Sequence, residues 1–192
     1  MDNIILIGMP AVGKSTVGVL LAKAVGYGFV DSDLVIQSRE GRLLSRIIAD
    51  EGIDRFLEIE GRINAELCVD RCVIATGGSV IYNEKAMRHL KEIGRIVYLK
   101  ISLEELERRL SDLTGRGVAI REGYTLKDLY DERAPLYEKY ADVTADLDGK
   151  DISAALNEIL EALVSGELLC TVRARWERCS ARFWLGRGRT SI

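Results

Sequence analysis

A glycine-rich run near the N-terminus has the residue types and the spacing of a phosphate-binding loop, or P-loop. It reads Gly8-Met-Pro-Ala-Val-Gly-Lys-Ser and matches the pattern G-x-x-x-x-G-K-[ST] in full. Its glycines allow successive backbone N–H groups to face one anion, and a helix beginning directly after the loop adds partial positive charge. Lys14 is expected to reach the β- and γ-phosphates of a nucleotide, and the Ser15 hydroxyl to bind Mg²⁺. The pattern therefore predicts nucleotide binding by Gly8, Ala11, Val12, Gly13, Lys14, Ser15 and Thr16.

Two shorter groups of residues could complete a site for phosphoryl transfer. Asp31 and Asp33 are separated by one residue, so one carboxylate can lie near Mg²⁺ while the other accepts a hydrogen bond from a substrate hydroxyl. Paired acids of this kind also occur as helix caps, and that interpretation stays open. The run Thr-Gly-Gly-Ser at residues 76–79 contains Gly77 and Gly78, which would let the backbone approach a ligand closely or simply form a turn.

Three arginines are candidates for contacts with phosphates or with a substrate carboxylate. They are Arg109, Arg116 and Arg133. Guanidinium groups stabilise the charge of a transferring phosphoryl group and bind carboxylates through paired hydrogen bonds, although each arginine could equally be a surface residue. The single histidine, His89, has no partner pattern and is interpreted as an exposed helix residue.

Short apolar runs separated by helix-length segments are the elements that must position these residues. The runs resemble buried parallel strands and span residues 3–8, 27–30, 72–75, 95–99 and 141–147. Apolar spacing and capping patterns predict helices at 14–25, after Ser102, after Thr125 and at 152–164. This alternation favours an α/β fold, in which a parallel sheet carries helices on both faces. Gly8, Asp31 and Gly77 each follow a strand, so the three motifs should meet beyond the carboxyl ends of the strands, where such sheets bind ligands.

The overall composition argues against several classes of protein. The 192 residues carry a net charge of −3, whereas a general nucleic-acid binder needs an excess of Lys and Arg. No apolar run approaches the roughly 18 residues of a membrane span, and no secretory signal pattern is present. The four cysteines form no C-x-x-C pair, which indicates free thiols in a reducing compartment. We therefore expect a cytoplasmic protein that acts on a small molecule.

The end of the sequence differs in composition from the rest. Residues 167–192 contain six Arg and two acidic residues and carry a net charge of +4, which leaves −7 for residues 1–166. The same segment holds both tryptophans, Trp176 and Trp184. We expect one globular domain over residues 1–166 and an atypical basic tail. The tail is either a docking segment or an appended or out-of-frame extension, disordered or without a function of its own.

The order of these motifs resembles that of the shikimate kinase family over residues 3–165. The matches are consecutive and comprise the P-loop at 8–16, Asp31-Ser-Asp33 with Ile36 and Gly41, the turn at Gly77 and Gly78, a lid-like segment around Arg116, and Arg133-Ala-Pro-Leu-Tyr137. The last run fits the family's Arg-x-Pro-Leu-Tyr pattern. The resemblance implies a P-loop three-layer α/β/α sandwich with a five-stranded parallel sheet and a mobile lid.

The resemblance also implies an activity. Members of this family use ATP and Mg²⁺ to phosphorylate shikimate to shikimate 3-phosphate, a step of chorismate and aromatic amino-acid biosynthesis. Carried over by position, Lys14 would contact the phosphates, and Ser15 with Asp31 would hold Mg²⁺. Asp33 would orient and deprotonate the acceptor hydroxyl. The family leans towards a monomer, and the same is expected here.

The three arginines receive roles from the same resemblance. Arg116 would close from the lid onto the phosphates and take part in catalysis beside Lys14 and Asp33. Arg109 would lie by the adenine, and Arg133 would bind the substrate carboxylate.

The sequence departs from the family pattern on the acceptor side. Where the family has Phe-Arg-x-x-Glu, this chain has Phe-Leu-Glu-Ile-Glu, so Leu57 takes the place of an arginine that helps to bind the carboxylate, with Arg55 as a candidate replacement. Ser79 replaces a third glycine and brings a side chain to the substrate side. The lid reads Gly-Arg-Gly-Val at residues 115–118, where the family commonly has Arg-Pro. The expected substrate-binding residues are Asp33, Leu57, Gly77, Gly78, Ser79 and Arg133.

Three interpretations of the function therefore stand. Shikimate is the leading acceptor. Another small polyol or hydroxy acid is the alternative, because the acceptor side is altered while the ATP side is intact. A nucleotide-binding module without catalysis is the third, although it would have little use for Asp33, Arg116 and Arg133.

Overall fold

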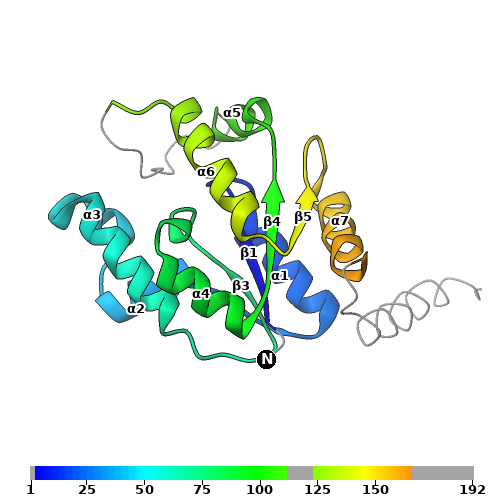
Figure 1. The fold of residues 1–192 in the computed structure, drawn as a ribbon, viewed down its shortest axis with the longest axis horizontal. Coiled ribbons are helices and arrows are strands. Elements are labelled where there is room, and N and C mark those ends of the chain that lie inside the picture. The colour runs from blue at the N-terminus through cyan, green and yellow to red at the C-terminus, as the bar shows by residue number, and fades with distance from the viewer. Residues whose placement is uncertain (1–2, 112–122, 166–192) are drawn as a thin grey trace, which may run out of the picture.

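The computed structural model describes residues 3–111 and 123–165, which form a five-stranded parallel sheet between two layers of helices (Figure 1). The strand order is β2-β3-β1-β4-β5, and every neighbouring pair is parallel. The strands are β1 Asn3–Ile7, β2 Gly28–Asp31, β3 Cys72–Ala75, β4 Gly94–Lys100 and β5 Val143–Asp146. The predicted α/β sandwich with a five-stranded parallel sheet is confirmed.

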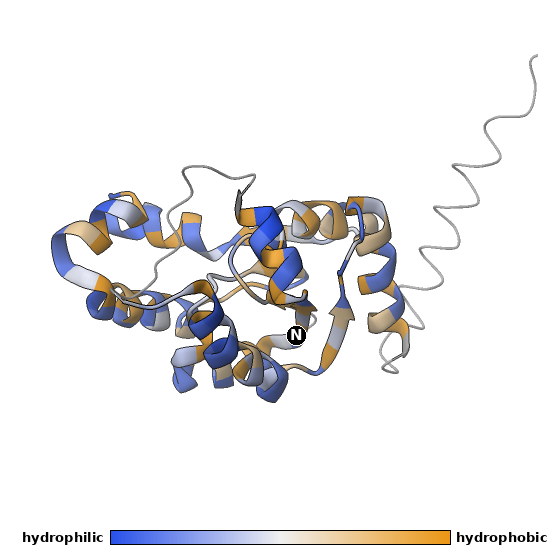
Figure 2. Cartoon of the chain, turned by 90° about the horizontal axis from the view of Figure 1, so that it is seen from above, coloured by the Kyte–Doolittle hydropathy of each residue, from blue (hydrophilic) through white to orange (hydrophobic). Residues whose placement is uncertain are grey.

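Helices cover both faces of this sheet. On one face lie α1 (Lys14–Val25) and α7 (Ile152–Ser165), which also pack against each other. On the other face, α4 (Glu84–Ile93) and α6 (Leu126–Tyr140) pack against β4. Figure 2 shows hydrophilic and hydrophobic residues around most helices, as expected for helices with one buried and one exposed side.

The remaining helices lie beside this second layer. α2 (Ser32–Glu40) packs against α3 (Leu44–Ala65), and α3 packs against α4 and the short 3-10 helix η1 (Val80–Tyr82). α5 (Leu103–Ser111) follows β4 and contacts α6.

The central strand is buried from end to end. All five residues of β1 are buried because both faces of the sheet are covered, which explains the continuous apolar run. Its one polar side chain, Asn3, donates hydrogen bonds to the carbonyls of Val69 and Ile93 at 2.8 and 2.9 Å. The side-chain oxygen Oδ1 of Asn3 accepts a hydrogen bond from the backbone N–H of Cys72 at 2.9 Å. These bonds tie β1 to its neighbours and so fix where the loop after Ile7 emerges.

The predicted elements agree closely with the observed ones. α1 has the predicted bounds, β2 is displaced by one residue, and the last strand is shorter than the predicted 141–147. Thr125 caps α6 in the predicted reciprocal arrangement with Asp128. The prediction of an exposed His89 is wrong. Its side chain is half-buried, and its Nε2 lies 2.7 Å from the carbonyl oxygen of Leu67.

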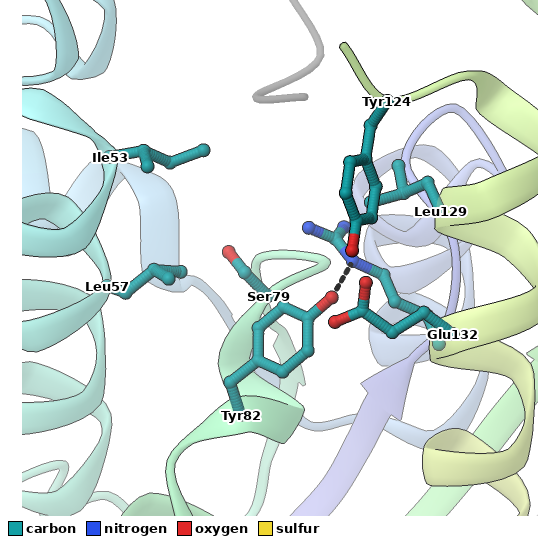
Figure 3. A pocket seen from close by; sticks show the side chains of 8 residues that line it. Ile53, Leu57, Ser79, Tyr82, Tyr124, Leu129 and Glu132 are labelled. Atoms are coloured by element: carbon teal, nitrogen blue, oxygen red, sulfur yellow. Dashed lines mark hydrogen bonds between the residues drawn. The ribbon is translucent and has the colours of Figure 1, made fainter. Parts of the chain in front are cut away.

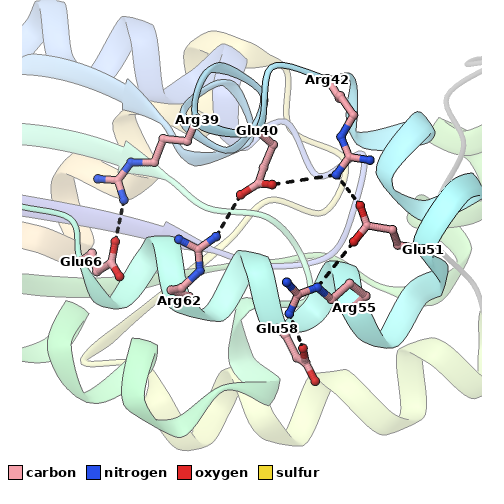
Figure 4. Close-up of polar contacts among 8 residues, drawn as sticks. All are labelled: Arg39, Glu40, Arg42, Glu51, Arg55, Glu58, Arg62 and Glu66. Carbon is pink, nitrogen blue, oxygen red and sulfur yellow. Dashed lines mark hydrogen bonds and ion pairs between the residues drawn. The ribbon is translucent and has the colours of Figure 1, made fainter.

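Helices α2 and α3 form a pair held together on two sides. Along the exposed side, Arg39 pairs with Glu66 at 2.7 Å and Arg62 pairs with Glu40 at 2.9 Å (Figure 4). Beneath these ion pairs, Ile36 of α2 lies in a small apolar cluster with Ile47, Phe56, Ile59 and Ile63 of α3. Exposed ion pairs contribute about 0–1 kcal/mol each, so the apolar cluster accounts for most of the stability of this pair.

Two segments named by the sequence predictions lie outside the described residues. They are the lid around Arg116 and the basic tail at 167–192. Within residues 3–111 and 123–165, no helix has both the length and the apolar character needed to cross a membrane.

Candidate active site

The P-loop connects the carboxyl end of β1 to the first turn of α1. Its backbone passes through left-handed conformations at Gly8, Ala11 and Gly13, with φ values of 147°, 63° and 99°. Among the described residues, Ala11 and Arg71 are the non-glycine residues with a positive φ. Such backbone conformations concentrate at ligand-binding loops, because they turn consecutive N–H groups towards one point.

Lys14 lies at the start of α1 with its ammonium group folded back over the loop. Its Nζ donates to the carbonyl oxygens of Gly8 and Met9 at 2.7 and 2.9 Å. Only 8% of the residue is exposed, and burial lowers the pKa of Lys14 to about 8, an effect that Asp33 opposes. The ammonium is therefore poorly hydrated and ready to interact with an anion that enters the loop.

Asp31 and Asp33 follow β2 and have different roles in the structure. The Asp31 carboxylate caps α2, and its Oδ1 accepts from the backbone N–H groups of Asp33 and Leu34 at 3.0 and 3.4 Å. The cap interpretation is thus correct for Asp31, whose second oxygen is not used by the cap. Asp33 Oδ1 is buried and has no hydrogen-bond partner among the described residues. Burial raises the pKa of Asp33, Asp31 adds to the increase, and Lys14 opposes it.

A cavity of about 520 Å³ brings the predicted motifs together at the carboxyl edge of the sheet. The P-loop forms one wall and the turn after β3 another, and residues of α2, α3, α5 and α6 complete the lining. Its polar and charged lining includes Lys14, Ser15, Thr16, Asp33, Glu60, Thr76, Ser79 and Arg133. The convergence that strand-end positions predict is therefore observed in the described residues.

Glu60 is a charged residue of this cavity that sequence reasoning missed. It is 1% exposed, and its Oε2 accepts a hydrogen bond from the Ser79 hydroxyl at 2.6 Å. Its Oε1 has no hydrogen-bond partner among the described residues. Burial raises the pKa of Glu60 to about 7, and the bond from Ser79 opposes that increase. Ser79 does line the cavity, but its hydroxyl is engaged by Glu60.

The turn after β3 leaves no room for a side chain at its first glycine. A Cβ on Gly77 would lie 1.9 Å from Glu60 Oε1 and 3.1 Å from Asp33 Oδ1. The two carboxyl oxygens without partners therefore lie beside the same glycine. The Gly77 N–H donates to the Ser32 hydroxyl oxygen at 3.1 Å, which ties the turn to α2.

Arg133 is the buried cation on the opposite wall. It is 4% exposed, and its Nε donates to the hydroxyl of Tyr82 at 3.1 Å. Its guanidinium also lies over the Tyr82 ring, 5.2 Å from the ring centroid. Nearby, the Tyr137 hydroxyl donates to the Gly78 carbonyl at 2.6 Å and so joins α6 to the glycine turn. No pattern in the sequence marks Tyr82, because its role depends on a partner 51 residues away.

A second cavity of about 520 Å³ lies on the other side of the P-loop. Arg109 lines it, and its guanidinium donates to the Val12 and Leu147 carbonyls at 3.0 and 3.3 Å. This position is next to the P-loop. The role of Arg109 by the adenine stays a prediction.

Two further acceptor-side predictions can be compared with the structure. Leu57 lines a small recess next to Arg133, whereas Arg55 pairs with Glu51 and Glu58 on the exposed side of α3 (Figure 4). Arg55 is therefore engaged away from this recess. Arg116 lies outside the described residues and is not placed.

Comparison with known proteins agrees with this geometry. A family model described as shikimate kinase matches residues 10–164. A shikimate kinase of Pseudomonas paraeruginosa is 39% identical over 166 residues, covering 85% of this chain and 96% of the relative. A shikimate kinase of Thermodesulfovibrio yellowstonii is 37% identical over 173 residues, covering 87% of this chain and 99% of the relative.

Solved structures give the same result. The shikimate kinase from Acinetobacter baumannii in complex with shikimate matches with a TM-score of 0.77 and 32% identity, covering 88% of this chain and 96% of that chain. The shikimate kinase from Aquifex aeolicus matches with a TM-score of 0.70 and 31% identity, covering 85% and 96%. The motifs, the fold and these relatives agree, and the chain belongs to the shikimate kinase family.

Proposed function

We propose that this protein transfers the γ-phosphoryl group of ATP to the 3-hydroxyl of shikimate. The observation that carries the proposal is a buried carboxyl oxygen, Asp33 Oδ1, without a partner in the described residues, in a cavity that also contains Lys14 and Arg133. The P-loop lysine, a carboxylate that could act as a base and a cation that could bind a carboxylate thus line one cavity. The proposal includes the cytoplasm as the compartment, a monomeric enzyme, and chorismate biosynthesis as the pathway that the family resemblance implies.

On the donor side, the P-loop would hold the triphosphate of ATP. Its backbone N–H groups and Lys14 would neutralise the phosphate charge, and the helix that begins at Lys14 would add its partial positive charge. Arg109 would contact the adenine, and Arg116 would close over the phosphates.

Ser15 after the P-loop and Asp31 at the end of β2 have side chains that fit Mg²⁺. Ser15 and Asp31 offer one hydroxyl oxygen and one carboxylate oxygen that the helix cap does not use, and Mg²⁺ prefers such hard oxygen ligands. A site with few protein ligands is typical of Mg²⁺ that is shared with substrate phosphates. The ion would offset the charge on the transferred phosphoryl group.

On the acceptor side, Asp33 would accept a hydrogen bond from the reacting hydroxyl and take its proton as the bond to phosphorus forms. A carboxylate with a raised pKa is a better base than an ordinary aspartate, and burial raises the pKa of Asp33. Arg133 would hold the carboxylate of shikimate, which fixes the hydroxyl in line with the phosphate.

The decisive assay measures ATP consumption with shikimate and with a panel of small polyols and hydroxy acids. Asp33→Asn should lower kcat by about 100- to 10,000-fold and leave ATP affinity unchanged, because it removes the base and not the phosphate contacts. Asp70→Asn, at an exposed aspartate, is the matched control. Turnover of another panel member in preference to shikimate would reject the proposed acceptor, and a large loss of ATP binding in Asp33→Asn would reject the role of Asp33.

A further inference from the structure

The cavity that contains Lys14, Asp33 and Arg133 is called the main cavity below. A small recess opens beside it, between α3, the turn at η1 and α6 (Figure 3). Its volume is about 20 Å³, which is room for one or two non-hydrogen atoms. Ser79 and Arg133 line both the recess and the main cavity, so the two spaces adjoin. A substrate ring in the main cavity could therefore place one small substituent in the recess.

The polar groups of the recess are gathered on one side. Figure 3 shows the Tyr82 hydroxyl, the Ser79 hydroxyl and the Glu132 carboxylate turned towards its middle, with Ile53 and Leu57 on the opposite wall. Leu129 completes the apolar part of the lining. Hydrogen bonds made against such a wall are stronger than those made in open water.

Tyr82 and Tyr124 both place a phenol at the recess, and Tyr82 lies directly against Arg133. Its oxygen accepts the Nε–H of Arg133, which uses one lone pair and leaves the O–H group to serve as a donor. Burial raises the pKa of Tyr82, so the phenol keeps its proton at neutral pH. Within residues 3–111 and 123–165, Arg133 forms no ion pair with a carboxylate; besides Tyr82, its guanidinium interacts with the Tyr137 hydroxyl, and its five N–H groups leave further donors for a ligand.

We propose that the Tyr82 hydroxyl is a second hydrogen-bond donor to the carboxylate of the acceptor, acting beside Arg133 at the mouth of the recess, which has room for one of the two carboxylate oxygens. The inference rests on the proposed function, since shikimate carries the carboxylate in question. It makes Tyr82 a specificity-determining residue: the phenol binds one carboxylate oxygen while the guanidinium binds the other. Leu57 gives the recess an apolar wall, which strengthens both bonds by excluding water.

Glu132 is the group that could compete for the Tyr82 proton. It is exposed at the edge of the recess, and it contributes to the raised pKa of Tyr82 through a hydrogen bond. A substrate carboxylate held by Arg133 would replace Glu132 as the acceptor of the hydrogen bond from the Tyr82 hydroxyl. Removing the charge of Glu132 should therefore leave the effect of Tyr82 on the substrate intact.

The test compares shikimate with its methyl ester in ATP-coupled turnover. Tyr82→Phe removes only the hydroxyl and should raise KM for shikimate about 10- to 100-fold, with KM for ATP unchanged, because hydrogen bonds to charged groups are worth that factor. KM for the ester should change far less, so the preference for the free acid should shrink. The matched control is Tyr130→Phe, which removes a hydroxyl bonded to the Ile101 carbonyl on the same helix as Arg133.

Each outcome of this test decides the inference. An unchanged preference for the acid in Tyr82→Phe would overturn it. So would an effect of Tyr82→Phe that disappears in a Glu132→Gln background, because Tyr82 would then act only through Glu132. Absence of shikimate-dependent ATP consumption in the wild type would reject the proposed function, and this inference with it, before any variant is made.

Discussion

At the residue scale, four ionisable side chains surround one cavity with balanced charge. Lys14 and Arg133 are cations, and Asp33 and Glu60 are acids. Burial shifts the pKa of Lys14 down to about 8 and that of Glu60 up to about 7, so both groups titrate near neutral pH in the protein without ligand. The anionic phosphates of ATP would stabilise the charged form of Lys14, and proton uptake by this residue would accompany binding above about pH 8.

Glu60 should make the stability of the protein depend on pH. The folded state binds its proton more tightly than the unfolded state, so its contribution to stability is present in full below about pH 4.5 and is lost as the pH rises through about 7. Because Glu60→Gln cannot ionise, the free energy of unfolding of this variant should fall less than that of the wild type between pH 5 and pH 8. The difference should be on the order of 3 kcal/mol. Urea unfolding at both pH values measures it, and parallel pH dependences would contradict the prediction.

The sequence predicts the site only where the signal is local. The P-loop and the Asp31–Asp33 pair are recognisable because their chemistry depends on neighbours a few residues away. Glu60 and Tyr82 are not, since each depends on a distant partner, Ser79 for Glu60 and Arg133 for Tyr82. Glu60 ends the run Phe-Leu-Glu-Ile-Glu, so it is marked only by the resemblance to the family pattern and not by its neighbours on a charged helix.

At the scale of elements, α3 contains a kink that shapes the acceptor side. Gly52 interrupts the helix with φ 82° and ψ 169°, a conformation that is essentially restricted to glycine. Leu44 and Ile48 before the kink line the main cavity, as do Phe56 and Glu60 after it, whereas Ile53 and Leu57 line the recess. Residues from both sides of the kink therefore line the main cavity.

Gly52→Ala should destabilise the protein by about 1–3 kcal/mol, although no atom lies within 4 Å of the added Cβ, because the cost is one of backbone conformation. Denaturant unfolding measures this cost, and KM for shikimate should rise as the cavity walls shift. An increase in the free energy of unfolding of Gly52→Ala would contradict this prediction. If the helix could straighten without cost, alanine would stabilise it by about 1 kcal/mol through its higher helix propensity.

The elements themselves were largely predictable, and the exceptions have a physical cause. Strands of a covered parallel sheet are continuous apolar runs, and α1 has a clear start after the P-loop and a glycine at its end. The kink at Gly52 has no such marker, because a glycine within a helical pattern is compatible with a straight helix. His89 was misassigned because its partner is a backbone carbonyl on another segment.

At the scale of the whole molecule, the strand order places the P-loop at the centre of the carboxyl edge. β1 lies between β3 and β4, so the loop that follows it is flanked by the turn after β3 on one side and by the segment after β4 on the other. The main cavity and the cavity near Arg109 lie on opposite sides of this loop.

The boundary of the catalytic domain can be tested by truncation. The family match ends at residue 164 and α7 ends at Ser165, so deletion of 168–192 should leave the unfolding midpoint and the turnover rate unchanged. Deletion from residue 157 onwards is the contrasting case. It removes the buried Ile159, Leu160 and Leu163 and should prevent stable folding, since each buried leucine or isoleucine contributes about 2–5 kcal/mol. Near-complete loss of activity on removing only 168–192 would show that the tail has a role.

The apolar wall at Leu57 has a consequence for inhibitor selectivity. Relatives that carry an arginine at this position present a second cation to a bound acid, whereas this chain presents a hydrocarbon surface. A shikimate mimic with a small alkyl group next to its carboxylate should therefore be tolerated by this protein and disfavoured by those relatives. The Leu57 side chain would then separate this protein from relatives that carry an arginine there.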